Sequence, residues 1–599
     1  MSARVALTIA LGVIVPRFSA IAAAPDFATD IAPILYSQCA SCHHAGGVGP
    51  FALVTYDDAK RHAHQIAAVT ATGYMPPWPP DPGFGDFQGE RKLTARQIQA
   101  ISEWVKNGCP QGNPESAPPP PVFSDGWQLG KPDLILQAKK PLHIQPGGTD
   151  VFWNFLFKPD LKQTHYIRAI EIKPTGLKEP DLNSPQLIHH ANLLIDRSGS
   201  SLKRERNPGE GFGGMDLAIN RNPLDPDSHF LFWKPGSQPY FEPPGFAWRL
   251  DPGNVLVLNT HLQPSGKAEE VPPAIGLYFT DEPPRFFPLL IQLEADEQLN
   301  IPAGARHFRV TDDLTLPEGV SVLAVYPHAH YLGTCLEGFA TLPDGTRRPL
   351  IRISHWDLNW QSVYRYREPL HLPKGTVISM RYEYDNSAGN VRNPNDPPKR
   401  VVAGNEARDE MAHLWLQVLP DGSGDRRRPI QEALLRHRLE KTPGDYAASL
   451  GLGALAMARL DPQSAIPMFE GAIRADPSRS EAHDMLGAAL RNVGRFSDAL
   501  IEFQLAVRLD PGDMQAHYNL ANALVRAGKW DDAVHEMKQV AAAYPESARI
   551  QAEFGFLLYR AGDGAAASTQ FRSALKLDPS NKQAAEGLAL VSQSGLERK

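Results

Sequence analysis

The spacing of hydrophobic positions changes along the chain and divides it into regions of different structure. From about residue 130 to 420, short runs alternate apolar and polar positions with a period of two, and Gly and Pro turns separate them. Examples are HYIRAIEI, NVLVLNTHL, VSVLAVYPHAHYL and TVISMRYEYD. Such runs predict strands with one buried face. The length of this region predicts two all-β sandwiches, over residues 130–290 and 291–420.

An amphipathic helix is predicted ahead of the β region, in LTARQIQAISEWVKNG. Its helical pattern ends at Gly108, and a glycine commonly terminates a helix. The proline-rich stretch NPESAPPPPVF follows and predicts a stiff, extended linker over residues 113–129. The apolar positions on one face of the helix are Ile98, Ile101, Trp104 and Val105.

Near the C-terminus, residues of the same type recur every 34 positions. This period, with its columns of proline, small and aromatic residues, is the signature of the tetratricopeptide repeat. Small residues stand where paired helices approach closely, and large ones fill the space towards the next repeat. The pattern predicts an all-α solenoid over residues 441–599, after a linker at 421–440 and closed by a helix from Lys582. The recurring positions are Pro443, Pro477, Pro511, Pro545 and Pro579; Gly453, Gly487, Ala521 and Gly555; Ala465, Ala499, Ala533 and Ala567; and Phe469, Phe503, Met537 and Phe571.

Composition narrows the class of protein without identifying it. The 599 residues are 42% hydrophobic and 21% charged, which is ordinary for a globular protein. The net charge of −7 gives no sign of a nucleic-acid footprint. Four cysteines in a chain of this size do not make a disulfide scaffold.

The first 24 residues have the pattern of a signal peptide. Arg4 supplies a positive charge, an apolar run extends from Val5 to Val15, and small residues at 22–24 offer a cleavage site. The alternative is a membrane anchor, but Pro16 interrupts the run well before the roughly 20 apolar residues that a bilayer requires. We therefore expect an exported, periplasmic protein without a membrane span.

The motif CASCHH predicts a covalently bound haem c. In Cys-x-x-Cys-His, Cys39 and Cys42 form thioethers to the macrocycle and His43 takes one axial position on the iron. A thioredoxin-like pair would require a surrounding βαβ pattern, and a zinc site would require a second Cys-x-x-Cys; neither is present in the sequence. For the second axial position we favour Met75, in the proline-rich loop TGYMPPWPP, because a thioether is a common axial ligand. The alternatives are His62 and His64.

Residues 25–112, with this motif and helices at both ends, resemble a small class I cytochrome c. The resemblance implies a small all-α domain that carries electrons on one haem. After the haem pair, Cys109 and Cys335 remain and fall in different predicted domains, so we expect two separate free thiols.

The predicted strands carry histidines that suggest metal sites. A buried histidine must find a partner or stay neutral, and a histidine pair, a His-x-His and a Met beside such strands are hard to explain by packing alone. Residues two apart on a strand share a face, whereas adjacent residues do not; the adjacent pair can therefore share one metal only if the strand bulges there. The candidate ligands are His189 and His190 in LIHHANLLI, His261 in VLNTHLQPSG, His328 and His330 in VYPHAHYLG, and Met411 in DEMAHLWL.

Ligand chemistry separates the two predicted sites. Imidazole suits zinc, copper, iron and nickel, so three histidines alone leave the metal open. Two histidines with the thioether of Met411 favour copper, and copper(I) in particular.

Residues from about 130 to 420 resemble the copper type II, ascorbate-dependent monooxygenases, the family of peptidylglycine α-hydroxylating monooxygenase and dopamine β-monooxygenase. The matching stretches occur in family order: the His-His pair, WKPGSQPYFEPPGFAWRLDPGNVLVLNTHLQPSG, the His-x-His followed by Leu-Gly, and DEM, preceded by DLNWQSVYRY and YEYDNSAGNVRNPNDPP. The resemblance implies two jelly-roll-like copper domains on either side of a solvent-filled cleft. One copper, held by His189, His190 and His261, would store an electron. The other, held by His328, His330 and Met411, would meet dioxygen beside the substrate.

The sequence departs from the peptide-amidating members at the substrate. They carry an arginine two residues before the His-x-His, where this chain has Tyr326, and an asparagine and a tyrosine where it has His413 and Trp415. Tyrosine cannot make the bidentate pair with a carboxylate that arginine makes. The departures favour a different, apolar or aromatic substrate, although Trp415 can equally be a core residue.

We therefore expect an exported copper monooxygenase that hydroxylates a C–H bond of a small organic molecule with dioxygen. The electrons would come from ascorbate or a redox protein, or through the fused haem domain. The repeats predict a groove for a protein partner, or else a spacer or dimerisation arm. The alternative function is a non-catalytic periplasmic redox or copper-binding protein that recruits a partner through its repeats.

Overall fold

A computed structural model describes residues 24–45, 47, 49–123, 126–174, 188–215, 231–234, 237 and 239–594. The predicted signal peptide lies outside these residues except for its last position. The chain divides into two compact units, which are described separately. Of the described residues, unit 1 comprises those within 24–78 and 89–130, and unit 2 comprises those within 79–88, 131–174 and 188–594. Among the described residues, no helix is both long and apolar enough to cross a membrane.

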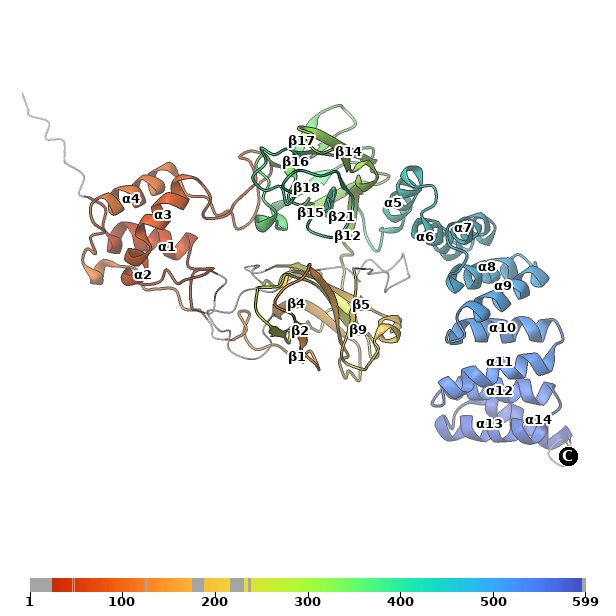
Figure 1. Cartoon of the computed structure of the whole chain (residues 1–599). Coiled ribbons are helices and arrows are strands. Elements are labelled where there is room, and N and C mark those ends of the chain that lie inside the picture. Colours follow the sequence, from red (N-terminus) through yellow and green to blue (C-terminus); the bar gives the residue numbers. More distant parts are fainter. Residues whose placement is uncertain are drawn as a thin grey trace, which may run out of the picture. The chain divides into compact units, whose positions relative to one another are not determined.

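Unit 1 is helical where it is described, as the sequence predicts (Figure 1). The predicted amphipathic helix is α4; Thr94 caps it through a capping box with Gln97, and Gly108 follows it with a φ of 79°. Ile101 and Trp104 are fully buried. The helical segments of unit 1 are η1 (Phe27–Ile31), α1 (Ala32–Gln38), α2 (Tyr56–Arg61), α3 (Ala63–Ala71), α4 (Ala95–Lys106) and η2 (Pro114–Ser116).

The first part of unit 2 is a pair of facing antiparallel sheets. One has the strand order β6-β3-β9-β5-β7 and the other β1-β11-β4-β8, with a short β10-β2 ribbon beside them. Apolar residues from both sheets form one core, including Phe155, Ile167, Leu258 and Ile275. The strands are β1 (Leu134–Gln137), β2 (Leu142–Ile144), β3 (Val151–Phe157), β4 (His165–Lys173), β5 (Ile188–Asp196), β6 (Phe212–Gly213), β7 (Leu231–Trp233), β8 (Trp248–Leu250), β9 (Val255–Leu262), β10 (Glu269–Val271) and β11 (Ala274–Thr280).

The second part of unit 2 has its own sheets, in the orders β12-β21-β15-β18 and β14-β19-β16-β17, with a β13-β20 ribbon. These two sheets also pack face to face, since a Cβ on Gly338 of β16 would lie 2.8 Å from the side chain of Leu414 on β21. The strands are β12 (Leu289–Glu294), β13 (Asn300–Ile301), β14 (Phe308–Thr315), β15 (Val320–His328), β16 (Gly333–Thr341), β17 (Arg347–Ile353), β18 (Tyr364–Leu372), β19 (Val377–Tyr384), β20 (Val401–Val402) and β21 (His413–Pro420), with turns η5 (Asp296–Gln298) and η6 (Leu358–Trp360).

One short segment departs from the predicted domain limits. Residues 79–88 lie inside the stretch expected to form the cytochrome-like domain, yet they belong to unit 2. Phe87 makes a β-bridge with Tyr366, and the backbone N–H of Asp81 donates to the carbonyl of Arg352. Backbone pairing of this kind depends on tertiary contacts that sequence periodicity does not report.

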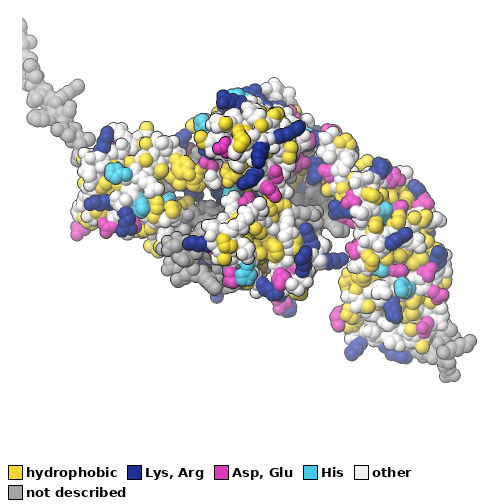
Figure 2. Space-filling model, viewed as in Figure 1, with side chains coloured by type: hydrophobic (Ala, Val, Ile, Leu, Met, Phe, Trp, Pro, Cys, Tyr) yellow, Lys and Arg dark blue, Asp and Glu magenta, His cyan; other side chains and the backbone are white. Residues whose placement is uncertain are grey.

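The C-terminal part of unit 2 is a series of antiparallel helix pairs (Figure 1). A Cβ on Gly453, Gly487 or Gly555 would approach the aromatic ring of the partner helix to 2.4–2.8 Å, so close packing requires glycine there. On the face shown in Figure 2, basic and acidic side chains are interspersed over these helices. The helices are α5 (Arg428–Lys441), α6 (Tyr446–Ala458), α7 (Pro462–Ala475), α8 (Ser480–Asn492), α9 (Phe496–Leu509), α10 (Met514–Arg526), α11 (Trp530–Ala543), α12 (Ala548–Arg560), α13 (Gly564–Leu577) and α14 (Lys582–Ser594).

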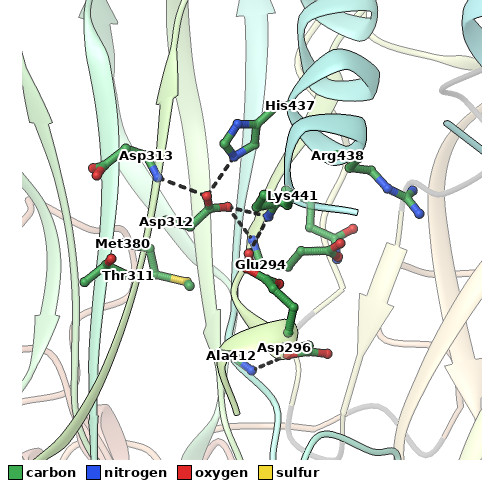
Figure 3. A network of polar contacts seen from close by, with 12 residues as sticks. Glu294, Asp296, Thr311, Asp312, Asp313, Met380, Ala412, His437, Arg438 and Lys441 are labelled. Carbon is green, nitrogen blue, oxygen red and sulfur yellow. Dashed lines mark hydrogen bonds and ion pairs between the residues drawn. The ribbon is translucent and has the colours of Figure 1, made fainter. Parts of the chain in front are cut away.

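Helix α5 is joined to the second pair of sheets through the carboxylate of Asp312 on β14 (Figure 3). His437 Nε2 lies 2.7 Å from its Oδ1, while Lys441 Nζ and the backbone N–H of Glu294 each lie 2.9 Å from its Oδ2. Burial raises the pKa of Asp312, but the hydrogen bonds from His437 and Lys441 outweigh burial and hold the pKa below its usual value. The charged carboxylate therefore anchors the helix at neutral pH.

Candidate metal centres

The adjacent histidines lie on β5 and the third lies opposite them on β9. His190 pairs with His261, whereas Ile188 pairs with Leu262, so the register shifts at His189. This irregularity is the bulge that adjacent ligands require, because it breaks the alternation that would send their side chains to opposite faces. The structure thus brings the three predicted ligands of the first site together.

Their ring nitrogens are close enough to bind one ion. One ligating nitrogen from each of His189, His190 and His261 lies within 4.8 Å of the others. The Nδ1 atoms of His189 and His190 are 3.2 Å apart, and the three ring centroids are separated by 4.9–5.3 Å. Among the described residues, no other group of three or more His, Cys, Asp or Glu side chains meets this criterion.

Asp150, just before β3, fixes the orientation of the third ring. His261 Nε2 lies 2.9 Å from Asp150 Oδ2, and Phe152 stacks on the ring with centroids 4.6 Å apart. Because a carboxylate accepts the Nε2 proton, Nδ1 carries the lone pair. That Nδ1 is buried and has no hydrogen-bond partner. A buried acceptor without a donor is costly, and a metal ion would satisfy it.

The protonation states suit metal binding. Burial, followed by the charge of His261, lowers the pKa of His189 to about 4. Burial also holds the pKa of His190 well below the ordinary value. Both imidazoles are therefore neutral at pH 7, and neutral imidazole is the form that ligates a metal.

The second site is built on the paired strands β15 and β21. His328 pairs with His413 and Tyr326 with Trp415, so these four side chains share one face of the sheet. His330 lies two residues after the end of β15, and Met411 lies two residues before the start of β21. The ring centroids of His328 and His330 are 5.3 Å apart.

Both predicted histidine ligands of this site use Nδ1 for hydrogen bonds. His328 Nδ1 lies 2.7 Å from Gln361 Oε1, and His330 Nδ1 lies 3.0 Å from the carbonyl of Asp409. A carbonyl oxygen only accepts, so Nδ1 carries the proton and Nε2 the lone pair. Burial holds the pKa of His328 well below its ordinary value and lowers that of His330 to about 4. Two neutral Nε2 donors and a thioether form a donor set that suits copper(I).

Glu410 holds the Met411 segment against the His-x-His. Its carboxylate accepts the backbone N–H of His330 at 2.8 Å, of Leu332 at 2.6 Å and of Met411 at 3.2 Å. Burial raises the pKa of Glu410 to about 8, although these N–H groups favour the charged form. Two segments that are about 80 residues apart in the chain are thereby joined at the site.

The two sets of ligands are neighbours in unit 2. The ring centroids of His190 and His328 lie 6.4 Å apart, at an interplanar angle of 73°. The solvent-filled cleft implied by the family resemblance is therefore not found between these two rings. A T-shaped contact at this distance leaves no room for a water layer.

The predicted haem motif directly follows α1. His43 Nδ1 lies 3.0 Å from the carbonyl of Phe51, which leaves Nε2 as the free lone pair. A Cβ on Gly49 would lie 2.6 Å from His43 Nδ1, so this loop can approach the ring only as glycine. Cys39 and Cys42 are partly exposed and free. These features fit a histidine held ready to ligate iron beside two available thiols.

The candidates for the second axial position differ in their surroundings. His62 stacks on Phe51 with ring centroids 3.7 Å apart, and Phe51 packs against His43 at 5.1 Å. His64 is exposed on α3. Met75 is partly buried in the loop after α3, where its backbone N–H donates to Val69. Cys109 and Cys335 are free.

The chain departs from the family at Tyr326, His413 and Trp415, and these three side chains lie around the second site. Tyr326 and Trp415 stack with centroids 5.0 Å apart, and the hydroxyl of Tyr326 donates to Gln361. His413 Nε2 lies 2.9 Å from Asp296 Oδ2. Trp415 is only partly buried, unlike the neighbouring Leu414 and Leu416, which point into the core.

Sequence reasoning missed the residues that orient the ligands: Asp150, Gln361, Asp409 and Glu410. Each acts across a strand pairing or a long loop, so only the folded chain reveals it. The one available signal was DEM, in which two carboxylates precede the methionine directly.

Comparison with known proteins bears on the helical region. Two family models described as tetratricopeptide repeat match residues 490–552 and residues 450–513 and 553–592. The C-terminal region consists of tetratricopeptide repeats. This confirms the prediction from the 34-residue period. No curated protein matches the chain.

Solved structures similar to the tetratricopeptide repeats include YrrB, described as a TPR protein with an unusual peptide-binding site. It is 23% identical, with 27% of this chain and 82% of that chain covered and a TM-score of 0.25. MamA 41-end from Desulfovibrio magneticus RS-1 is 19% identical, with 26% and 87% covered and a TM-score of 0.24. Pseudomonas aeruginosa pilF is 17% identical, with 29% and 78% covered and a TM-score of 0.26.

A buried histidine recurs in two successive repeats. His483 Nδ1 contacts Glu502 at 2.7 Å and His517 Nδ1 contacts Glu536 at 2.5 Å. In each repeat Nε2 faces a proline carbonyl, of Pro477 or Pro511. The carboxylate and the carbonyl tie the two helices of one repeat to the turn that precedes them.

Proposed function

We propose that this protein is an exported copper-dependent monooxygenase that hydroxylates a C–H bond of a small organic substrate with dioxygen. The observation that supports the proposal is the convergence of three imidazoles at the first site, together with a second pair of histidines whose ring nitrogens are oriented by hydrogen bonds. His189, His190 and His261 form the first set, in which the buried Nδ1 of His261 has no hydrogen-bond partner. The second set would consist of the Nε2 atoms of His328 and His330, which their Nδ1 hydrogen bonds leave available, and the thioether of Met411.

The residues present fit copper at both sites. All of the histidine ligands whose pKa is shifted are neutral at pH 7, and the soft sulfur of Met411 favours the reduced ion. When bound, two copper ions would supply the two electrons that hydroxylation with dioxygen requires, with water as the second product. The protein itself orients the ligands: Asp150 holds His261, Gln361 holds His328, and Glu410 holds the Met411 segment against His330.

We also propose that residues 25–112 form a cytochrome c domain. A haem bound by Cys39, Cys42 and His43, with Met75 as its second axial ligand, would supply single electrons, which is the form of reducing power that one-electron metals accept. The Nδ1–Phe51 hydrogen bond of His43 supports this assignment, because it leaves Nε2 for iron. If the haem does not supply the electrons, ascorbate or a separate redox protein would supply them.

The tetratricopeptide repeats support binding of a protein partner. Stacked repeats of this kind commonly offer an extended concave surface to a partner. We assign this region to recruitment rather than to catalysis.

Metal analysis with optical spectroscopy tests the proposal on full-length protein matured with haem. The expected result is one haem and two copper ions per chain. His190→Ala should remove one copper and His330→Ala the other, whereas replacement of the exposed His64 should remove neither. Loss of both coppers from either variant, or no copper in the unsubstituted protein, would exclude two independent sites.

Rapid mixing of the fully reduced protein with dioxygen tests the role of the haem. If the haem supplies electrons, its absorption should change to that of the oxidised form while product accumulates. Product formed while the haem stays reduced would assign the electrons to another donor.

A further inference from the structure

Two stretches that resemble the family, but to which no role has yet been assigned, lie in loops of the second pair of sheets. DLNWQSVYRY begins at Asp357, in the loop between β17 and β18, and YEYDNSAGNVRNPNDPP continues from β19 into the loop that precedes β20. The two loops contact each other, and the first of them contacts both histidines of the second site.

The loop between β17 and β18 orients both predicted histidine ligands. Gln361 Oε1 lies 2.7 Å from Nδ1 of His328, and Trp356 Nε1 donates to the backbone carbonyl of His330 at 3.1 Å. Gln361 and Trp356 are each 1% exposed, so water does not compete for these contacts. The position of segment 356–361 therefore determines how the ring of His328 and the backbone of His330 are held.

The segment is only partly fixed by its own hydrogen bonds. At its start, the N–H of Trp356 donates to the carbonyl of Thr334 on β16. Asp357 then caps η6, because its Oδ1 accepts the backbone N–H of Asn359 at 3.0 Å. The backbone hydrogen bonds of η6 also lie within the turn. These contacts shape the turn but do not attach Gln361 to the sheets.

Arg392, in the loop after β19, holds this segment from outside. Its Nη1 donates to the carbonyl of Trp356 at 2.7 Å, and its Nη2 lies 3.3 Å from Asp357 Oδ2. Asp357 uses its other carboxylate oxygen for the turn, so the two roles do not compete. A guanidinium holds two acceptors at once in a fixed geometry, whereas an ammonium group is a single point of charge.

The loop that carries Arg392 is itself firmly attached. Asn390 accepts the backbone N–H of Arg392 at 3.0 Å and donates to the carbonyl of Asp385 at 2.8 Å. Asn393 donates to the side chain of Asn386, which is fully buried. The amide nitrogen of Asn386 in turn contacts the carbonyls of Ile301, Pro302 and Lys399. The guanidinium therefore extends from a fixed backbone, as positioning another segment requires.

We propose that Arg392 is a positioning residue of the second site: by holding segment 356–361, it fixes Gln361 and Trp356, the two groups that orient His328 and His330. This inference rests on the proposed function for the identity of the site. Arg392 acts through the segment and not as a ligand. The role also explains why the two stretches occur together, because one carries the guanidinium and the other begins with the carboxylate that pairs with it.

Hydrogen exchange on full-length, copper-free protein tests the positioning directly. Arg392→Met removes both donors, and amide exchange in peptides that span 356–361 should become about tenfold faster, because the segment then opens independently of the sheets. Arg392→Lys retains the charge and should give an intermediate rate. The matched control is Arg309→Met, because Arg309 also pairs with a carboxylate, Glu383 at 2.9 Å, on the same pair of sheets. The control should leave exchange of this segment unchanged.

Copper(I) affinity at the second site tests the consequence for the ligands. Chelator competition should show about a fivefold loss in Arg392→Met, as the loss of one neutral hydrogen bond to the ring of His328 would give. When Arg392→Met is combined with Gln361→Leu, the loss should stay well below the product of the two single losses, about 25-fold, because both changes release the same ring. A role of Arg392 that is independent of this ring would give the full product.

Unchanged exchange of 356–361 in Arg392→Met, or a double variant that loses the full product, would overturn the inference and leave the proposed function standing. Faster exchange in a protein that binds no copper at the second site would support the holding of the segment by Arg392 and refute the proposed function. Circular dichroism verifies that each variant is folded, and Arg392→Lys serves in both measurements if Arg392→Met unfolds.

Discussion

The two candidate copper sites are built on similar strand pairs but present opposite ring nitrogens. At the first, a carboxylate takes the Nε2 proton of His261 and leaves its Nδ1 unpaired. At the second, an amide and a backbone carbonyl take the Nδ1 protons of His328 and His330. The lone pairs that remain there are on Nε2.

This difference shows that the hydrogen-bond partner of each histidine decides which nitrogen is available to a metal. It also shows that a carboxylate bound to one ring nitrogen does not by itself identify a histidine as a metal ligand. His261 and His413 each have Nε2 at 2.9 Å from a carboxylate and an unpaired Nδ1. Only His261 has two further imidazoles within reach of one ion.

Replacing the sulfur ligand should have the largest effect. Met411→Ile removes the only soft donor of the second site, and we expect hydroxylation to fall at least about 100-fold, since losing outer-shell partners alone costs 10- to 100-fold. Copper at the three-histidine site should remain. Product formation and copper content measure the two effects. Met380→Ile, a buried methionine of the same sheets, controls for packing. If Met411→Ile changes copper retention without any loss of turnover, the non-catalytic function is the better interpretation.

The second-largest effect is expected from replacing Asp150, the carboxylate that orients the ring of His261. In Asp150→Asn the amide can no longer hold the Nε2 proton of His261 by charge, and we expect copper affinity at the first site to fall about 10- to 100-fold. Competition with a copper chelator measures it. Asp296→Asn makes the same chemical change beside His413 and should leave both copper affinities unaltered. Equal losses in the two variants would contradict the distinction between His261 and His413.

The pH at which copper is released sharpens the comparison further. Burial lowers the pKa of His189 and of His330 to about 4. A lowered pKa keeps the neutral, ligating form as the pH falls through 6.5, so both sites should retain copper to about pH 5. Retention should then decrease about tenfold by about pH 3. Copper content after dialysis, with circular dichroism to exclude unfolding, measures this. Release from either site near pH 6.5 would mean that its histidines are not buried in this way.

Local pattern was enough to select the candidate ligands. The Cys-x-x-Cys-His and His-x-His motifs and the 34-residue period are local features, and one metal shared by adjacent histidines on a strand already required a bulge at His189. The structure has that bulge and the close Gly453–Phe469 contact that the repeat columns predict.

The orienting residues could not be predicted because they act across the fold. Asp150 is 111 residues from His261, and Gln361 is 33 residues from His328. Neither pairing has a sequence period, since each is created by strand register or by a loop that returns to the site. The transfer of residues 79–88 to unit 2 has the same origin.

The smallest effect is expected from replacing Gln361, the amide that orients the ring of His328 at the second site. Gln361→Leu removes the acceptor of the Nδ1 proton of His328, so the ring loses a neutral hydrogen bond rather than a charged one. A neutral hydrogen bond contributes about 1 kcal/mol, so copper affinity at this site should fall only about fivefold. Gln361→Glu should raise copper affinity instead, because it gives His328 a carboxylate partner like the one that Asp150 provides for His261.

Chelator competition on both variants, with Gln292→Leu on β12 as the matched control, measures these shifts. A loss in Gln361→Leu as large as that in Asp150→Asn would mean that the charge of the brace is unimportant. The two sites would then differ only in which ring nitrogen the hydrogen-bond partner leaves free for the metal, and not in how strongly that partner holds the ring.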